Sequence, residues 1–318
     1  MAGILKRRTI LLGAAALPAA PALAQPTWRP ERAVAIVVGF APGGGADTIA
    51  RGFADWARGA HGVNAVVENR TGASGSIATE RVARAAPDGH TVSVAVPSPI
   101  WVFPQLERAP YDPLRDLSYL AQVLTQPCPL YVRADSPIRD WDGFVAAARA
   151  RPGALRWGTS ASRGFAEILV SAAMRHLGLD TVSVPFRGGS EAIQALLGGH
   201  IEAVASSDFG PALGAGQVRL LVESGPLRIP GQEGVPTFRE LGYPLSVSVF
   251  YGAVAPAGLP APARAWWERA WLDYAASPAF RDLAGRMFGI VAPLDGAAFA
   301  AAVREGHAGF GRALAAMP

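Results

Sequence analysis

The sequence predicts an α/β protein of two domains, the second inserted into the first, each with a mostly parallel sheet flanked by helices. Short apolar runs alternate with amphipathic helical stretches along residues 33–96, and the same alternation returns along residues 129–224. A further apolar run, residues 246–256, has no partner strand in its own neighbourhood. The chain of 318 residues suits two domains of ordinary size. We therefore expect it to leave the first domain once and to return.

The first region predicts a β-α-β-α-β unit. Strands are expected at residues 33–40, 64–70 and 91–96, and helices at 46–60 and 76–90. The second helix is stopped by Pro87-Asp88-Gly89. This order favours a parallel, doubly wound sheet.

The second region repeats the pattern. Strands are expected at 129–134, 155–160, 181–186, 201–207 and 218–224, helices at 141–153, 164–179 and 189–199, and closing helices at 261–277 and 294–317. We place the two crossings near residues 124–127 and 239–246. Residues 25–124 and 246–318 then form the first lobe, and residues 125–245 form the inserted second lobe.

The N-terminus has the layout of a secretory signal peptide. Lys6, Arg7 and Arg8 precede an apolar stretch, and Ala22-Leu23-Ala24 precedes Gln25. The apolar stretch is far shorter than the ~20 residues of a membrane span. Residues 1–24 are therefore predicted to be a signal peptide, cleaved near Ala24/Gln25, which exports the chain from the cytoplasm. The paired arginines leave both general and twin-arginine export open.

Removal of that segment changes the charge balance. The chain has 29 Lys and Arg against 25 Asp and Glu, and the first 24 residues hold three of the positive charges and no negative one. The mature chain is thus nearly neutral, which argues against nucleic acid as a partner. Lys6 is the only lysine, so the mature chain has none for Schiff-base chemistry. The single cysteine, Cys128, cannot form an intramolecular disulfide.

Loops rich in Gly, Ser and Thr follow the expected strands, where ligands bind in open α/β sheets. They are residues 42–47, 97–101, 158–164, 187–190 and 206–209. Three expected helices begin after Gly45, Gly164 and Gly189, and helix N-termini hold carboxylates through unpaired N–H groups and the helix dipole. Glycine lets such a ligand approach the backbone. We therefore expect an anion site with free amides facing a cleft.

Structural roles are open for single residues of these loops. Glycines between a strand and a helix also serve tight turns, and Asp47 suits a residue that satisfies its own helix N-terminus. Arg163 and Arg187 suit either a bound anion or an ion pair within the protein.

Enzyme motifs are missing from the sequence. Gly43 and Gly45 begin a dinucleotide fingerprint, but Thr48 stands at the third glycine position. The sequence holds no phosphate-binding loop, no G-x-S-x-G nucleophile motif and no Cys/His cluster of metal-ligand spacing. We therefore expect no catalysis, no cofactor and no metal.

Several motifs together resemble the substrate-binding proteins of tripartite tricarboxylate transporters, also called Bug or TctC-like receptors. They include VVGFAPGGGADTIAR, VVENRTGASGSIATERVARAAPDGHTV, APYDPLRDLSYLAQV, VSVPFRGGSEAIQALLGGHIEAVASSD and GAVAPAGLPAP, and span nearly the whole mature chain. The resemblance implies a two-lobed periplasmic-binding-protein fold of type II, a Venus flytrap. It further implies a periplasmic receptor, not membrane-spanning, that passes a small organic anion to membrane permease subunits.

The resemblance also implies the ligand contacts. In the first lobe they are Gly43, Gly44, Gly45, Ala46, Asp47, Ser98 and Trp101. In the second lobe they are Thr159, Ser160, Ser162, Arg163, Arg187, Gly188, Gly189, Asp208 and Phe209.

The sequence departs from the family pattern in the second lobe. Arg163 stands in a loop that usually ends in a histidine, Arg187 replaces a common lysine, and Phe209 follows Asp208 where an asparagine is common. We expect a dicarboxylate or an aromatic carboxylate, with Phe209 or Trp101 stacking on its apolar part. A periplasmic enzyme acting on a small organic acid and a sensory receptor on the same scaffold are the alternatives.

Overall fold

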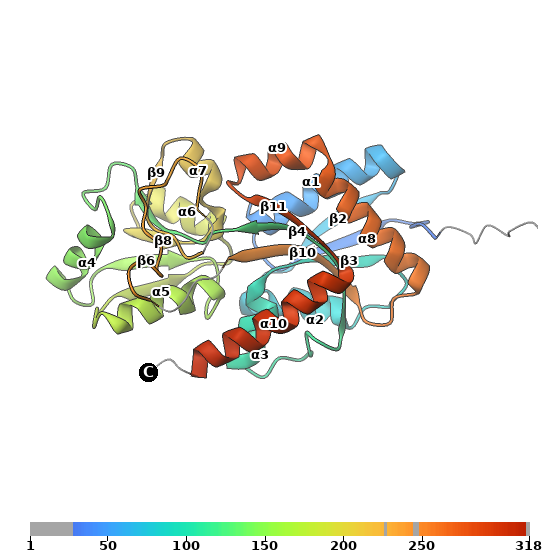
Figure 1. The fold of residues 1–318 in the computed structure, drawn as a ribbon, viewed down its shortest axis with the longest axis horizontal. Coiled ribbons are helices and arrows are strands. Elements are labelled where there is room, and N and C mark those ends of the chain that lie inside the picture. The colour runs from blue at the N-terminus through green and yellow to red at the C-terminus, as the bar shows by residue number, and fades with distance from the viewer. Residues whose placement is uncertain (1–27, 226–227, 244–247, 316–318) are drawn as a thin grey trace, which may run out of the picture.

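The computed structural model describes residues 28–225, 228–243 and 248–315. The predicted signal peptide lies outside the described residues. Figure 1 shows two halves, a blue, cyan and red one on the right and a yellow-green one on the left, each built around its own sheet. The two-lobed α/β fold predicted from the sequence is therefore confirmed.

The first sheet has six strands in the order β11-β4-β10-β3-β1-β2. Its strands are β1 Val34–Val38, β2 Ala65–Asn69, β3 Thr91–Ala95, β4 Leu117–Gln126, β10 Val249–Pro256 and β11 Ile290–Asp295. β1 pairs in parallel with both β2 and β3, whereas β10 is antiparallel to β3 and β4, and β11 is antiparallel to β4. Only β10 and β11 therefore run against the other four strands.

Helices cover both faces of the first sheet (Figure 1). They are α1 Gly45–His61, α2 Ser76–Ala83, α3 Phe103–Leu106, α8 Ala261–Ala276, α9 Pro278–Arg286 and α10 Gly296–Ala315, with short helical turns η1 Ala73–Gly75 and η2 Ser98–Val102. On one face the buried Phe53 of α1 stacks on Trp271 of α8, with ring centres 3.8 Å apart. Each such buried aromatic stabilises the fold by about 1.5–3 kcal/mol. The tryptophans of α8 therefore fix α1, and with it the loop that precedes α1.

The second sheet has five strands in the order β7-β6-β8-β5-β9. They are β5 Leu130–Arg133, β6 Arg156–Thr159, β7 Val182–Pro185, β8 Ala203–Ala205 and β9 Val218–Val222. The flanking helices are α4 Trp141–Ala150, α5 Phe165–His176, α6 Gly189–Leu197 and α7 Gly210–Gly214, and η3 Ser207–Phe209 precedes α7. β6 pairs in parallel with β7 and β8, and β5 is antiparallel to β8 and β9. Only β5 runs against the other strands, so both sheets are mostly parallel in strand direction.

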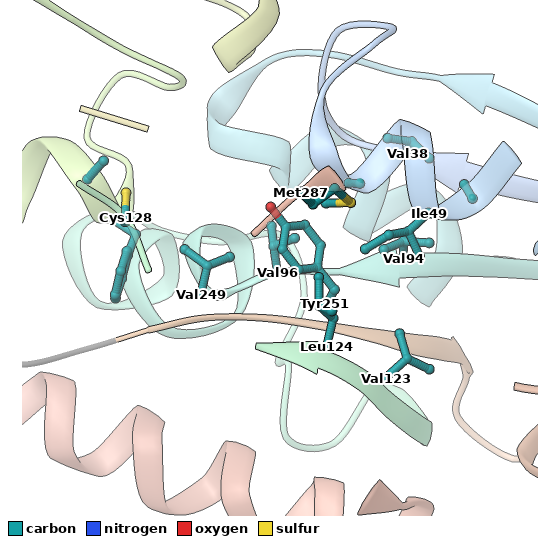
Figure 2. Packing of buried hydrophobic residues seen from close by; sticks show 14 of the residues in the cluster. Val38, Ile49, Val94, Val96, Val123, Leu124, Cys128, Val249, Tyr251 and Met287 are labelled. Carbon is teal, nitrogen blue, oxygen red and sulfur yellow. The ribbon is translucent and has the colours of Figure 1, made fainter. Parts of the chain in front are cut away.

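The chain passes from the first sheet to the second between Gln126 and Leu130 and returns between Val222 and Val249. The predicted lobe limits at residues 124/125 and 245/246 stay a prediction. Figure 2 shows the buried cluster near these crossings, with Val38, Ile49 and Val94 from the first sheet and its helix. Tyr251 and Cys128 belong to the same cluster. The packing is therefore continuous across the boundary between the sheets.

Two strands of the first sheet are absent from the sequence-based expectation. β4 is buried along nearly its whole length, so it shows no polar–apolar alternation. β11 has no fully buried residue and contains Pro293. The unpartnered run at residues 246–256 contains β10, which lies between β3 and β4; its residues 246 and 247 lie outside the described part.

Candidate functional site

Three helices begin at glycine N-caps, two of them one residue earlier than predicted. α1, α5 and α6 follow Gly44, Gly164 and Gly188, and none of these N-caps supplies a side-chain acceptor. The first-turn N–H groups of these helices therefore need acceptors from other parts of the chain. α1 belongs to the first sheet, and α5 and α6 belong to the second.

Asp208 supplies an acceptor to two of these helices. Its Oδ1 accepts a hydrogen bond from the Gly45 N–H of α1 at 2.6 Å, and the Gly189 N–H of α6 lies near enough to the same carboxylate to lower its pKa. We call the Gly45 and Gly189 N–H groups the paired amides. Burial raises the pKa of Asp208 above its ordinary value, although the hydrogen bonds from Gly45, Ser206 and Gly189 act to lower it. One carboxylate thus joins α1 on the first sheet to α6 on the second.

Glycine is needed at these positions because Asp208 and its neighbours approach so closely. A Cβ on Gly189 would lie 2.0 Å from Oδ2 of Asp208. A Cβ on Gly45 would lie 2.5 Å from the Tyr251 hydroxyl and 3.0 Å from Oδ1 of Asp208. Any other residue would therefore push the carboxylate away from the backbone. This is why the fold accepts the conformational entropy that the glycines lose on folding.

Ser98 makes the reciprocal contact. This buried residue follows β3 of the first sheet, and its hydroxyl accepts the Phe165 N–H, the first amide of α5 on the second sheet, at 3.1 Å. A side chain from each sheet therefore caps a helix of the other, in the manner of an N-cap.

Further contacts close the boundary between the sheets. Ala41 N–H donates to the Arg187 carbonyl at 3.0 Å, and the Ser190 hydroxyl donates to the Pro42 carbonyl at 3.0 Å. The Ser74 hydroxyl also donates to the Ser162 carbonyl. The cavity left between Ser98, Ser160 and Asp208 is only about 40 Å³. The structure thus describes a closed arrangement whose centre is too small for a solute.

The amides of the Gly43–Gly45 loop are not free, and this part of the sequence-based expectation is wrong for the closed arrangement. Gly43 N–H donates to Asp47 at 2.9 Å and Gly44 N–H donates to the Ala41 carbonyl at 3.3 Å, while Gly45 N–H is held by Asp208. The acceptors of these three amides have different origins. The bonds of Gly43 and Gly44 are local and shape the turn, whereas that of Gly45 depends on the approach of the second sheet.

Asp47 acts within its own lobe. Its buried carboxylate accepts hydrogen bonds from the Gly43 N–H, from Nε of Arg51 at 2.8 Å and from the Asn69 amide at 2.8 Å. Burial alone would raise the pKa of Asp47, but the hydrogen bonds from Arg51, Gly43 and Asn69 outweigh burial and lower it. Asp47 therefore orders the loop that leads into α1. The interpretation of Asp47 as the N-cap of its own helix is wrong, because Gly44 is the N-cap and Asp47 lies within the first turn.

Neither aromatic ring expected to stack on a ligand lines the central cavity, and that expectation is corrected. Phe209 is fully buried in the second sheet's core, between Tyr131 and Phe288. The Trp101 indole donates to the Val303 carbonyl of α10 at 3.1 Å and packs on Phe250. Both rings therefore pack within their own lobe.

The remaining predicted contacts of the second lobe fall into two groups. Ser160 lines the central cavity, Thr159 is buried beneath it, and Gly188 packs on Ala41 of the other sheet.

The exposed side chain of Arg163 pairs with Glu107. Arg187 and Ser162 line a shallow cavity of about 230 Å³ beside η1. On the first sheet, Ala46 lines the central cavity next to Gly45.

Tyr251 is a residue of the site that escaped the sequence-based prediction. The buried Tyr251 of β10 shares a hydrogen bond of 2.9 Å with the Ser207 hydroxyl, and its hydroxyl abuts Gly45. The sequence places Tyr251 in a strand of unknown neighbours, so its position beneath α1 could not be inferred before β10 was placed in the sheet.

The described part of the chain has no cluster of three His, Cys, Asp or Glu side chains that could hold a metal ion. Burial raises the pKa of the Cys128 thiol well above its usual range. Among the same residues, no helix is long and apolar enough to cross a membrane.

Comparison with known proteins reveals one consistent set of relatives. Residues 49–292 match the tripartite tricarboxylate transporter family receptor, TctC. The chain is 35% identical over 251 residues to the UPF0065 protein in gbd 5'region of Cupriavidus necator, which covers 79% of this chain and 76% of that protein.

Solved structures agree with the sequence comparison. A periplasmic transporter is 29% identical with a TM-score of 0.85, over 90% of this chain and 97% of that one. MatC from Rhodopseudomonas palustris, solved with bound malate, is 28% identical with a TM-score of 0.82, over 89% of this chain and 99% of that one.

Proposed function

This chain belongs to the tripartite tricarboxylate transporter receptor family, and on that premise we propose that it binds a small organic carboxylate between its two lobes and delivers it to the permease subunits of such a transporter. The resemblance drawn from the sequence motifs is confirmed, and the family is one of periplasmic solute receptors. We further propose that the chain binds the solute without catalysing a reaction.

One observation carries the proposal. Asp208 places a carboxylate against the paired amides, one from each sheet. The geometry therefore accommodates a carboxylate at the N-termini of α1 and α6, where the helix dipoles favour negative charge. Because one amide belongs to each lobe, the full set of donors exists only when the lobes are together.

The receptor cycle follows from this arrangement. When the lobes separate, Asp208 leaves Gly45 with its own lobe, and the α1 N-terminus is open to a solute carboxylate. Closure then adds donors from the second lobe, so the solute stabilises the closed form through its greater affinity for that form. MatC was solved with malate bound, which supports a carboxylate as the solute here.

A thermal-shift panel of small carboxylates tests the proposal. A solute present at a hundred times its Kd stabilises the folded protein by about 2.7 kcal/mol, which raises the Tm by several degrees. We expect at least one carboxylate to give this shift and to bind by calorimetry, with no chemical change of the acid in mass spectrometry. If no acid in the panel shifts the Tm, or if the bound acid is turned over, the proposal fails.

Location and delivery have their own tests. We propose that the exported chain is cleaved near Ala24/Gln25, and N-terminal sequencing of the periplasmic protein checks this site. Uptake of the labelled solute into cells that carry the permease should require this receptor. Uptake that is unchanged without the receptor would contradict delivery.

A further inference from the structure

Four successive residues before α2 have positive φ angles. They are +127° at Gly72, +45° at Ala73, +54° at Ser74 and +88° at Gly75, and we call residues 72–75 the positive-φ turn. Alanine and serine disfavour this conformation because Cβ comes too close to the following carbonyl oxygen. Such strain persists only where the surrounding structure holds it, and it is typical of ligand clamps and switch regions. The turn is therefore a candidate for a role in binding.

The first lobe holds the turn in place. A Cβ on Gly39, which follows β1, would lie 2.7 Å from Cα of Gly75, so the two backbones pack directly on each other. A Cβ on Gly75 would lie 3.2 Å from the Phe40 ring and 3.4 Å from Pro99. The Thr79 hydroxyl also donates to the Gly75 carbonyl at 3.1 Å. These contacts come from one lobe, so they fix the turn independently of the second lobe.

Ser74 connects the turn to the second lobe. It is buried, and its hydroxyl donates to the Ser162 carbonyl. Ser162 belongs to the loop of residues 160–164 that leads into α5, and Arg163 in that loop also has a positive φ, +51°. The turn and the loop line opposite sides of the shallow cavity of about 230 Å³. One hydroxyl therefore joins two strained segments, one from each lobe.

The loop that Ser74 contacts also forms the central cavity. Ser160 lines that cavity, and so does Phe165, whose N–H donates to Ser98. The Ser74–Ser162 bond therefore limits the movement of the segment that covers the cleft from the second lobe. Because the bond crosses between the lobes, it stabilises the closed form alone.

We propose that Ser74 is a positioning residue for retention of the solute: its hydroxyl holds the loop of residues 160–164 against the first lobe and slows opening of the cleft. The strained turn sets the position of this donor before closure, so less conformational freedom is lost when the bond forms. This inference rests on the proposed function and deepens it, because it names a residue away from the paired amides on which release of the solute depends.

Ser74→Ala tests the inference through two measurements. Stopped-flow binding of a carboxylate that shifts the Tm should show a dissociation rate about fivefold higher, with the association rate within about twofold of the wild type. Small-angle scattering of the solute-free variant should show a larger radius of gyration. A purely structural role within the first lobe would lower the Tm and leave both quantities unchanged. Ser74→Gly, which suits the positive φ, should give the same changes without a loss of Tm.

Ala73→Gly is the matched control, because it relieves the neighbouring strained position and keeps the Ser74 hydroxyl. It should hold or raise the Tm and leave the dissociation rate within about twofold. An unchanged dissociation rate or radius of gyration in the Ser74 variants, or an equal rise in rate for Ala73→Gly, would overturn the inference and leave the proposed function standing. Scattering needs no solute, so it decides the role of Ser74 in closure even if no carboxylate binds and the proposed function fails.

Discussion

The Asp208 carboxylate accepts a hydrogen bond of 2.6 Å from the Gly45 N–H, across the boundary between the two sheets. Asp208 follows β8 of the second sheet, and Gly45 is the first residue of α1 on the first sheet. The protein's own carboxylate therefore occupies the helix N-terminus that we propose for a solute carboxylate. This relationship leads directly to two predictions.

Asp208→Ala should open the ligand-free protein and tighten solute binding. The substitution removes a charge-assisted hydrogen bond between the lobes and a competitor for the Gly45 N–H. We expect a larger radius of gyration by small-angle scattering and a several-fold lower Kd for a carboxylate that binds. Glu107→Gln, which breaks the exposed ion pair with Arg163, is the control and should change neither quantity measurably. A weaker affinity in Asp208→Ala would mean that Asp208 contacts the solute.

Gly45→Ala should block closure while α1 still forms. The new Cβ would meet the Tyr251 hydroxyl at 2.5 Å and crowd Asp208, but the backbone of Gly45 is helical and accepts alanine. We expect at least a tenfold loss of carboxylate affinity by calorimetry.

The control for Gly45→Ala lies in the same helix. A Cβ on Gly59 meets nothing within 4 Å, so Gly59→Ala should raise the stability by up to about 1 kcal/mol and keep the affinity. Normal solute binding by Gly45→Ala would place the solute away from the α1 N-terminus.

Ser98→Ala should weaken the closed form through a different helix. Without the Ser98 hydroxyl, the buried Phe165 N–H at the start of α5 loses its acceptor, which costs about 1 kcal/mol. Ser277→Ala removes the comparable cap of α9 within one lobe. Chemical denaturation should show a similar loss of stability for both variants, but only Ser98→Ala should also weaken carboxylate binding. Equal carboxylate affinities in the two variants would show that Ser98 does not contribute to closure of the lobes.

Local sequence patterns predicted the helices of the site well. The expected helices at 46–60, 164–179 and 189–199 correspond to α1, α5 and α6, and their glycine N-caps are visible in the sequence. Helix starts are local events, decided by a cap and the periodic apolar face that follows it. The positions of the polar loops at the strand ends follow from the same reasoning.

Contacts between the lobes could not be predicted in this way. The bond from Gly45 to Asp208 joins residues 163 positions apart, and it depends on how the two sheets meet. Phe209 directly follows Asp208, yet its ring enters the core because η3 turns the chain there. Sequence reasoning therefore included Asp208 in the site, but it could not place the Asp208 carboxylate on the Gly45 N–H.

The buried Glu223 should lower the free energy of unfolding as the pH rises. Its side chain is buried just after β9, with Oε1 3.4 Å from the Ile229 N–H and no partner for Oε2 among the described residues. Burial raises the pKa of Glu223 from 4.5 to about 7, with Glu240 and Glu233 adding to the rise, against the lowering effect of Ile229 and Arg228. The folded protein therefore binds more protons than the unfolded chain between pH 4.5 and about 7. The contribution of Glu223 is complete below pH 4.5 and is lost as the pH rises through about 7.

Glu223→Gln isolates this contribution, because glutamine keeps the shape and stays neutral at every pH. Each unit of pKa difference corresponds to about 1.4 kcal/mol, so the wild type should lose up to about 3 kcal/mol between pH 5 and pH 8 relative to the variant. Chemical denaturation of both proteins at pH 5, 6, 7 and 8 measures the difference directly. We expect the variant to be the more stable of the two at pH 8, and their free energies of unfolding to converge toward pH 5. A constant difference across the four pH values would show that Glu223 is ionised in the folded protein throughout, stabilised there by a cation or by water rather than held as the neutral acid.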